Sequence, residues 1–417
     1  MDNHERKNAI NIALGESLWG LGGGLVASLT VFPLLLEHLG AGLVALGVFA
    51  GMARAGFLLT QPVGVLLFAH GQGRKRLILT YHACLSLSCH AILAVGVLVL
   101  GRSAKLHVAA RWLVILVFGV HVLGIGVILP VWQDWLAGLF SVRSRGRAWG
   151  ILGGSMAVTM SIGAVLAAKI RHRLDFPFNY SALLAAATVI FAMSLLLYSR
   201  VSSGHAPDGA PERHRLGELL TLFAGSLRVK NYRRYLVGRI LLAVGLGATG
   251  FMAVHFKGEE GGGLSDATII LLGAFLALPQ AGASYLLGVI GDHAGHKNGI
   301  LLGAVAQGAA ILVVFTWQGW VACALCFALV GLAMAANFVS HTNMVFETCP
   351  HDGRVAHITL SSLVIGPFLA AAFPATGWLI AIVGSSTVGI GLCAVPTLLG
   401  ALWILLMVRE PRQVVLT

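Results

Sequence analysis

Long apolar stretches recur along the whole chain and are separated by short polar segments. Each stretch has about 20 residues or more, which is the length that an α-helix needs to cross a bilayer. The stretches lack the alternation of barrel strands, and only helices and closed barrels satisfy the backbone in lipid. The pattern therefore predicts an all-α membrane protein with twelve spans. These are expected at residues 10–37, 41–68, 77–100, 108–139, 148–169, 177–199, 234–256, 267–290, 299–317, 320–347, 356–383 and 386–408.

The composition agrees with this pattern. Of the 417 residues, 57% are hydrophobic and 11% are charged, whereas a soluble domain has about 25% charged residues. The formal net charge of +12 raises the question of a nucleic-acid partner, but no compact basic domain with aromatic side chains is present. We therefore expect no nucleic-acid partner, and membrane lipid around most of the surface.

The basic residues predict the orientation in the membrane. Of the 28 Lys and Arg residues, nineteen lie in one set of loops and termini and seven lie in the opposite set. Cytoplasmic loops of membrane proteins carry the excess of Lys and Arg. We therefore expect a multi-pass protein of the cell (inner) membrane with both termini in the cytoplasm.

The longest polar segment, residues 200–231, divides the predicted spans into six and six. Its first part, "SSGHAPDGAPERHR", has the composition of a linker. Its second part, "LGELLTLFAGSLRVKNYRR", has apolar residues at helical spacing and predicts a short helix on the inner membrane surface. The predicted organisation is a first bundle at 1–199, a linker at 200–231 and a second bundle at 232–417.

The two halves repeat each other. Corresponding spans and loops contain similar motifs at offsets of 222, 223 and 207 residues, and the longer loop between spans 3 and 4 explains the smaller offset. Internal repeats of this kind are typical of secondary transporters. The matched glycines are Gly73 with Gly295, Gly15 with Gly238, and Gly146 with Gly353.

The loop after span 8 carries the most informative motif. It has Gly288, then Asp292 and His293, and then "GHK" at residues 295–297. Over its whole length the chain resembles the major facilitator superfamily, whose loop signature has this spacing of Gly, Asp and basic residues. The copy after span 2 keeps Gly73, Arg74 and Lys75 but has His70 and Gly71 at the usual Asp and basic positions.

The resemblance implies two pseudo-symmetric six-helix bundles and a conformational latch in these loops. Glycine permits the sharp bend, and Asp292 is expected to hydrogen-bond the N-terminus of a neighbouring helix. The basic side chains are expected to hold the turn at the anionic inner leaflet, and a simple connector remains the alternative. The latch residues are Gly73, Arg74, Lys75, Gly288, Asp292, Gly295 and Lys297.

Ionisable side chains inside the spans are candidates for function, because each costs about 2.5–3.5 kcal/mol at the middle of a helix. They are Glu16, Arg54, His82, His90, His121, Asp134, Arg239, His341 and Glu347. The resemblance implies that spans 1, 4, 7 and 10 line a central cavity. This makes Glu16, His121, Asp134, Arg239, Asn337 and His341 candidates for substrate binding and coupling, and Arg54 on span 2 is a further candidate because its charge needs a partner.

Two pairs of candidates take matched positions of the repeat. Glu16 corresponds to Arg239, so an ion pair or a shared substrate site is plausible, and pairing of each within its own half is the alternative. Asp134 corresponds to His341, although a contact with the nearby arginine-rich loop competes. Arg54 keeps its charge at any ordinary pH and needs a carboxylate or an anionic substrate as its partner.

The segment "HACLSLSCH" looks like a metal motif. On an α-helix His82 and Cys89 share a face while Cys84 points elsewhere, so four ligands do not converge. The chain also lacks a Gly-rich phosphate loop of the G-K-[ST] type. We expect no metal site, no cofactor and no enzymatic activity, because no nucleophile, base or metal set converges.

The sequence therefore predicts a monomeric secondary active transporter that works by alternating access. The substrate is expected to be a small polar or anionic solute, since two arginines lie inside spans. Coupling to protons is expected because Glu16, Asp134 and the histidines can titrate. The alternatives are a facilitator or exporter of amphipathic compounds in the same fold, and a membrane sensor or scaffold that transports nothing.

Overall fold

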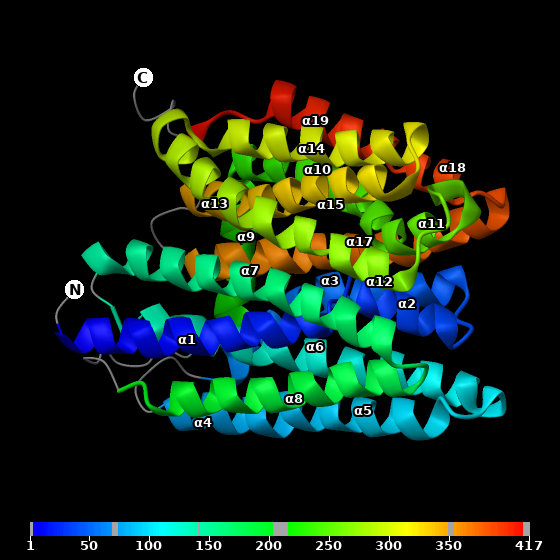
Figure 1. The fold of residues 1–417 in the computed structure, drawn as a ribbon. Helices are drawn as coiled ribbons and strands as arrows, with labels where there is room; N and C mark the ends of the chain where they lie inside the picture. The colour runs from blue at the N-terminus through cyan, green and yellow to red at the C-terminus, as the bar shows by residue number, and fades with distance from the viewer. Residues whose placement is uncertain are drawn as a thin grey trace. The chain divides into compact units, whose positions relative to one another are not determined.

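The computed structural model describes residues 3–68, 74–137, 139–140, 142–202, 216–348 and 354–411. These residues form helices and turns, with no strand among them (Figure 1). Eleven helical segments in this part of the chain are long and apolar enough to cross a membrane. They overlap the second to the twelfth predicted spans, so the predicted all-helical membrane fold is confirmed for these eleven.

The first predicted span differs from the expectation. Residues 10–37 are divided between α1 (Asn3–Leu25) and α2 (Val31–His38), with a break over residues 26–30. Helix α1 has 23 residues but is not among the eleven. Charged residues in its first turns, together with Glu16 in its middle, make it less apolar than the other spans. Within the described residues, eleven spans rather than twelve therefore meet the criteria of length and composition.

The chain divides into two compact units, and the first contains Met1–Ala41 and Thr60–His214. Two helices of this unit, α4 and α5, are joined by a π-helical segment, Ala83–Leu87. Its helices are α1, α2, the end of α3 (Leu43–Leu67), α4 (Arg74–His82), α5 (Ser88–Leu100), α6 (His107–Ala137), α7 (Val142–Arg173) and α8 (Phe178–Ser199).

Helix α1 is the packing centre of the first unit and lies alongside α7 and α8 (Figure 1). The crossing with α7 brings the two backbones together at glycines. A Cβ atom on Gly24 would lie 2.1 Å from the backbone oxygen of Met160, and one on Gly163 would lie 2.3 Å from that of Leu21. Small residues permit this close approach of helices in a membrane.

The second unit contains Gly42–Leu59 and Arg215–Thr417. Its spans 7 and 10 are interrupted by a 3₁₀ segment at Leu246–Gly250 and a π-helical segment at Asn337–His341. Its helices are the start of α3, α9 (Leu216–Arg228), α10 (Lys230–Gly245), α11 (Met252–Lys257), α12 (Asp266–Leu272), α13 (Ala274–Ala294), α14 (His296–Thr316), α15 (Gly319–Ala336), α16 (Thr342–Glu347), α17 (Arg354–Val383), α18 (Ser386–Leu392) and α19 (Ala394–Met407).

The internal repeat extends to the packing of each unit. Helix α10 packs against α17 and α19, just as α1 packs against α7 and α8 in the first unit. The sequence repeat equates spans 1, 5 and 6 with spans 7, 11 and 12, which are these helices. The first part of α3 also packs on α17, because a Cβ on Gly47 or Gly51 would lie within 2.6 Å of the backbone oxygens of Phe373 or Ala370.

Helix α9 lies where the sequence predicts a short helix after the linker. It buries Leu219 and Ser226, while Leu216, Leu220 and Leu227 remain exposed. The position of this helix on the membrane surface stays a prediction. The linker residues 203–215 lie outside the described residues.

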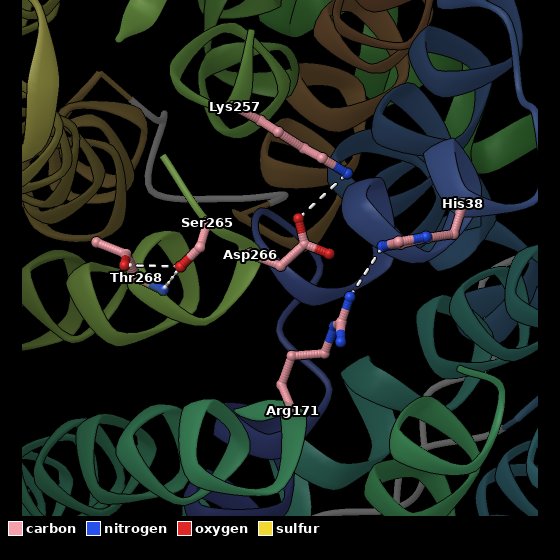
Figure 2. A network of polar contacts seen from close by, with 6 residues as sticks. All are labelled: His38, Arg171, Lys257, Ser265, Asp266 and Thr268. Atoms are coloured by element: carbon pink, nitrogen blue, oxygen red, sulfur yellow. Dashed lines mark hydrogen bonds and ion pairs between the residues drawn. The ribbon is translucent and has the colours of Figure 1, made fainter. Parts of the chain in front are cut away.

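The helix ends of each unit are held by polar contacts, which Figure 2 shows. In the first unit, Nη2 of Arg171 donates to Nε2 of His38 at 3.0 Å, and the guanidinium lies 5.3 Å from the ring centre of Tyr180. In the second unit, Nζ of Lys257 lies 3.1 Å from Oδ1 of Asp266. Ser265 caps α12, since its hydroxyl accepts the backbone N–H of Thr268 at 3.2 Å.

Glu260 holds a second connection of the same unit. Its Oε2 accepts hydrogen bonds from the Ser386 hydroxyl at 2.8 Å, the Thr387 backbone N–H at 2.7 Å and the Thr387 hydroxyl at 2.9 Å. Partial burial acts to raise the pKa of this carboxyl. The hydrogen bonds from Thr387, Ser386 and Ser385 outweigh burial and lower the pKa to about 2.

The glycine crossing gives a stability prediction. We expect Gly163→Ala to destabilise the protein by about 1–3 kcal/mol, because the new methyl group has to displace the backbone of α1. The measurement is the thermal unfolding midpoint of the purified protein in detergent. The control is Gly153→Ala on the same helix, where a Cβ meets nothing within 4 Å. Equal losses in the two variants would show that the crossing is not tight.

The Glu260 contacts give a prediction about pH. Because its folded-state pKa lies below the unfolded value of about 4.3, the carboxylate stabilises the fold above that value and loses this effect as pH falls towards 2. We expect Glu260→Gln to cost roughly 1.5 kcal/mol at pH 7, the low end for bonds to a charged group at a partly exposed site. The difference in unfolding midpoint from wild type should narrow as pH falls below about 5 and should close towards pH 2.

The matched control for this prediction is Glu259→Gln. Glu259 is the neighbouring residue, and its side chain is exposed. We expect its replacement to leave the unfolding midpoint at pH 7 unchanged. A gap between wild type and Glu260→Gln that stays constant down to pH 3 would rule out the proposed role of the carboxylate.

Candidate functional site

A cavity of about 200 Å³ lies inside the first unit. Its wall is mostly apolar, with a few polar groups from α1, α4, α6 and α8. Binding sites for small molecules and ions commonly combine an apolar wall with few polar groups. The cavity is lined by Glu16, Trp19, Ile78, Leu79, His82, Ile125, Ile128, Leu129, Trp132, Met156, Leu195 and Tyr198.

Glu16 projects into this cavity from the middle of α1 and is 8% exposed. The hydroxyl of Tyr198 on α8 donates to its Oε1, and the Trp132 side chain hydrogen-bonds Tyr198 in turn. Glu16 is therefore the last acceptor of a hydrogen-bond chain that runs from Trp132 through Tyr198 within the first unit. Arg239, its predicted partner, belongs to the other unit, so the ion pair between them stays a prediction.

Three histidines gather beside the cavity. His82 on α4 meets the Trp19 ring edge-on at 5.7 Å, while His90 on α5 lies 4.9 Å from Phe191 and 4.8 Å from His121 on α6. Trp19 and Phe191 are themselves 4.5 Å apart. The histidines, which the sequence places far apart on two spans, therefore form one cluster together with two aromatic rings.

The π-helical segment explains why His82 and His90 point the same way. Eight residues of an α-helix make about 2.2 turns, which would separate the two side chains by roughly 80°. A π-turn takes up one extra residue, so the spacing becomes equivalent to seven residues, about 1.9 turns. The structure thus places His90, rather than Cys89, in register with His82, and His121 interacts electrostatically with both.

A second polar cluster lies in the second unit, where α10 faces span 10. The Tyr235 hydroxyl lies 3.0 Å from Nδ1 of His341 and donates to the His341 backbone oxygen at 3.1 Å. Arg239, one helical turn after Tyr235, interacts electrostatically with both of these residues. Its Nη1 is buried and has no hydrogen-bond partner among the described residues.

The π-helical segment Asn337–His341 adds further polar atoms without partners. Nδ2 of Asn337 donates to the Ala333 backbone oxygen at 2.9 Å, but Oδ1 has no partner. The Ser340 hydroxyl is also buried without one. Buried polar atoms usually have partners, and π-segments frequently occur at functional sites, so this part of span 10 is a candidate binding surface.

Arg54 on α3 belongs to the same unit as span 10. Its Nη2 lies 3.5 Å from the Sδ atom of Met334, one turn before Asn337. A thioether is a weak acceptor and does not compensate a charge. Among the described residues, no carboxylate pairs with Arg54 or with Arg239.

The latch residues divide between described and undescribed positions. Gly73 and the side chains of Arg74, Asp134 and Asp292 lie outside the described residues. Lys75 donates from Nζ to the backbone oxygens of Ser199 at 2.5 Å and Val201 at 2.6 Å. These two bonds join the start of span 3 to the end of span 6.

More of the latch residues of the second unit belong to the described part of the chain. Gly295 has a φ of 84°, which favours glycine, and a Cβ there would lie 2.1 Å from Glu410. Oε2 of Glu410 accepts the backbone N–H of Lys297 at 2.8 Å, while a Cβ on Gly288 would meet nothing within 4 Å. Within the described residues, no group of three or more His, Cys, Asp and Glu could hold a metal ion.

Sequence reasoning about ionisable side chains missed several members of these clusters. Tyr198 and Tyr235 escape it because a hydroxyl carries no charge, although each sits on a predicted span and contacts a candidate residue. The available signal was helical spacing, since Tyr235 precedes Arg239 by four residues and so shares its face. The effect of the two π-segments had no sequence signal that we can name.

The Glu16–Tyr198 contact gives a prediction. We expect Tyr198→Phe to destabilise the protein by roughly 1–3 kcal/mol, because the buried carboxyl loses its donor. In a double-mutant cycle with Glu16→Gln, the two losses should add to more than the loss of the double variant. Thermal unfolding in detergent measures each value. Strict additivity would show that the contact stabilises nothing, and Ser17→Ala, which removes only a bond within α1, is the control.

Comparison with known proteins gives structural matches only. No family model matches the chain, and no curated protein matches it. A mutant of the nucleoside transporter NupG is similar with a TM-score of 0.71 and 11% identity, over 98% of this chain and 100% of that one. A bacterial homologue of the human drug peptide transporters PepT1 and PepT2 has a TM-score of 0.71 and 13% identity, over 99% and 100%.

A D-xylose-proton symporter is also similar, with a TM-score of 0.69 and 15% identity, over 98% of this chain and 99% of the symporter. Likeness at such low identity extends to the fold. The matches cover nearly the whole chain. The chain has the fold of the major facilitator superfamily.

Proposed function

We propose that this protein is a secondary active transporter that moves a small polar or anionic solute by alternating access and couples the movement to protons. The fold supports transport, because the similar structures include transporters of nucleosides and a proton symporter of D-xylose. The proposal further includes α1 as a twelfth span, a monomeric protein of the inner membrane and cytoplasmic termini, as the basic loops predict.

The observation that carries the proposal is the buried guanidinium of Arg239. A charge in an apolar bundle costs several kcal/mol unless it is paired, yet Nη1 has no partner among the described residues. Tyr235 and His341 interact electrostatically with it, and Asn337 lies four residues before His341 on span 10. A carboxylate or phosphate group of a substrate would compensate the charge, and Arg geometry suits such groups.

The proposed coupling residue is Glu16. A carboxyl group that lines a cavity and holds one hydrogen bond from Tyr198 can bind or release a proton without the loss of that bond, because the phenol donates in both states. Asp134 and His121 are further candidates from the sequence. The latch residues, Asp292 among them, are proposed to stabilise one conformation of the transporter, as the resemblance implies.

A binding test with matched solutes addresses the substrate class. The pairs are glucuronate with glucose, lactate with 1,2-propanediol, and glucose 6-phosphate with glucose. We expect one of the anions to raise the unfolding midpoint of the purified protein, since a ligand at one hundred times its Kd stabilises by about 2.7 kcal/mol. The uncharged member of that pair should give no shift.

The variant Arg239→Gln should abolish the shift and leave the midpoint without solute equal or higher, because no carboxylate among the described residues pairs with the charge it removes. The control is Arg234→Gln on the same helix, whose Nη1 bonds the Met407 backbone oxygen at 3.3 Å. The bound anion should then enter proteoliposomes faster with an alkaline interior. Stabilisation by uncharged solutes alone, or uptake that ignores the pH gradient, would contradict the proposal.

A further inference from the structure

His82, His90 and His121 form one cluster in the first unit, and the proposed function gives a role to His121 alone. His90 is 3% exposed, and Nδ1 of His121 is buried without a hydrogen-bond partner among the described residues. Burial of polar rings in an apolar bundle costs free energy unless their nitrogens form hydrogen bonds. Together with the π-turn that aligns His82 with His90, these facts call for an explanation beyond packing.

The hydrogen bonds show which nitrogens can take a proton. Nδ1 of His82 lies 3.0 Å from the Ile78 backbone oxygen, and Nδ1 of His90 lies 2.7 Å from that of Ser86. A carbonyl oxygen only accepts, so both Nδ1 atoms carry hydrogen and both Nε2 atoms keep a lone pair. The cluster therefore presents basic nitrogens, and no metal ligand set surrounds them in the described part of the chain.

Each neighbouring helix places its own groups around the cluster. Helix α1 contributes the titratable Glu16, α8 contributes Tyr198, and α7 contributes the apolar Met156 to the shared cavity. Cys89 precedes His90 and is buried, while the Tyr81 hydroxyl is held by the Gly124 backbone oxygen at 3.0 Å. Among the residues that line the cavity together with His82, Glu16 is thus the acidic one.

We infer that His82, His90 and His121 form one proton-binding site within the first unit, which holds a single proton and exchanges it with Glu16 through the cavity. One proton is the capacity because two cationic rings 4.8 Å apart would repel each other in apolar surroundings. The inference deepens the proposed proton coupling, and it rests on that proposal only for its role in transport.

The transfer step is balanced within the protein. The Glu16 carboxyl releases its proton and becomes a carboxylate, while the lone pair on Nε2 of His82 accepts the proton and the ring becomes an imidazolium. Both residues line the same cavity. Its volume of about 200 Å³ has room for bridging water, since one water occupies about 30 Å³ of liquid. His121 and His90 then share the charge, because His121 interacts with both other rings.

The first test counts protons bound by the full-length protein in lipid nanodiscs between pH 8 and pH 4. Replacement by Asn is conservative for His82 and His90, because Asn337 and Asn343 of this chain make the same bond to the backbone oxygen four residues earlier. We expect each single variant, including His121→Asn, to bind as many protons as wild type. The triple variant should bind about one proton fewer.

The control variant is His107→Asn, at the start of the same helix as His121, where the ring bonds the Gly101 backbone oxygen at 3.1 Å. It shows how the exchange of a histidine outside the cluster changes the proton count. The inference is overturned if each cluster variant loses one proton, or if the triple variant loses none. Should the triple variant fail to fold, the single variants alone still separate shared from independent titration.

The second test uses Trp19, whose ring meets that of His82 edge-on. A protonated imidazole quenches a neighbouring indole, so the fluorescence of the protein should show a pH-dependent step that Trp19→Phe and His82→Asn remove. Glu16→Gln should keep the amplitude of this step and move its midpoint, while Ser17→Ala should do neither. A step with the same midpoint in Glu16→Gln would overturn the exchange with Glu16.

These tests need no substrate and are therefore separate from the test of transport. A shared proton in a protein that moves no solute would leave the inference standing and remove the proposed function. Proton-driven uptake in a protein whose histidines titrate independently would do the reverse.

Discussion

A polar group inside a helical bundle surrounded by lipid has no water to bind, so its partner comes from the protein or from what the protein carries. Most polar side chains in the described part of this chain have a hydrogen-bond partner within the protein. Ser194 donates to the Gly15 backbone oxygen across two helices, and Tyr232 donates to that of His357. A few groups, Arg239 and His121 among them, have a buried nitrogen without such a partner among the described residues. These groups therefore mark the places where a solute or a proton is expected.

The sequence was sufficient for much of the fold because length and apolar character decide where a helix crosses a bilayer. Eleven spans follow from that rule, and one matched pair of glycines, Gly15 and Gly238, lies on α1 and α10, which pack in equivalent ways in their units. The first span was predicted as one helix and is two, because the chain leaves the helical conformation over residues 26–30, between α1 and α2. Apolar content alone does not show such a break.

The candidate site was less accessible to sequence reasoning. Glu16 and Arg239 were identified by their charge inside a span together with their matched positions in the repeat. Their surroundings depend on tertiary packing, since Tyr198 reaches Glu16 from a helix 182 residues away and His341 reaches Tyr235 across 106 residues. A regular α-helix with 100° per residue would place His82 and Cys89 on one face. The π-helical segment Ala83–Leu87 places His90 there instead.

The π-turn at Ala83–Leu87 also has a consequence for how this protein can change over evolutionary time. Loss of a single residue from that segment would turn the span into an unbroken α-helix at little cost to its apolar length. Every side chain before the deleted position would then be rotated by about 100° about the helix axis relative to the side chains after it. A relative with one residue fewer there would keep the span but present a different face to its neighbours, so an alignment gap of one position would separate two functional classes of the same fold.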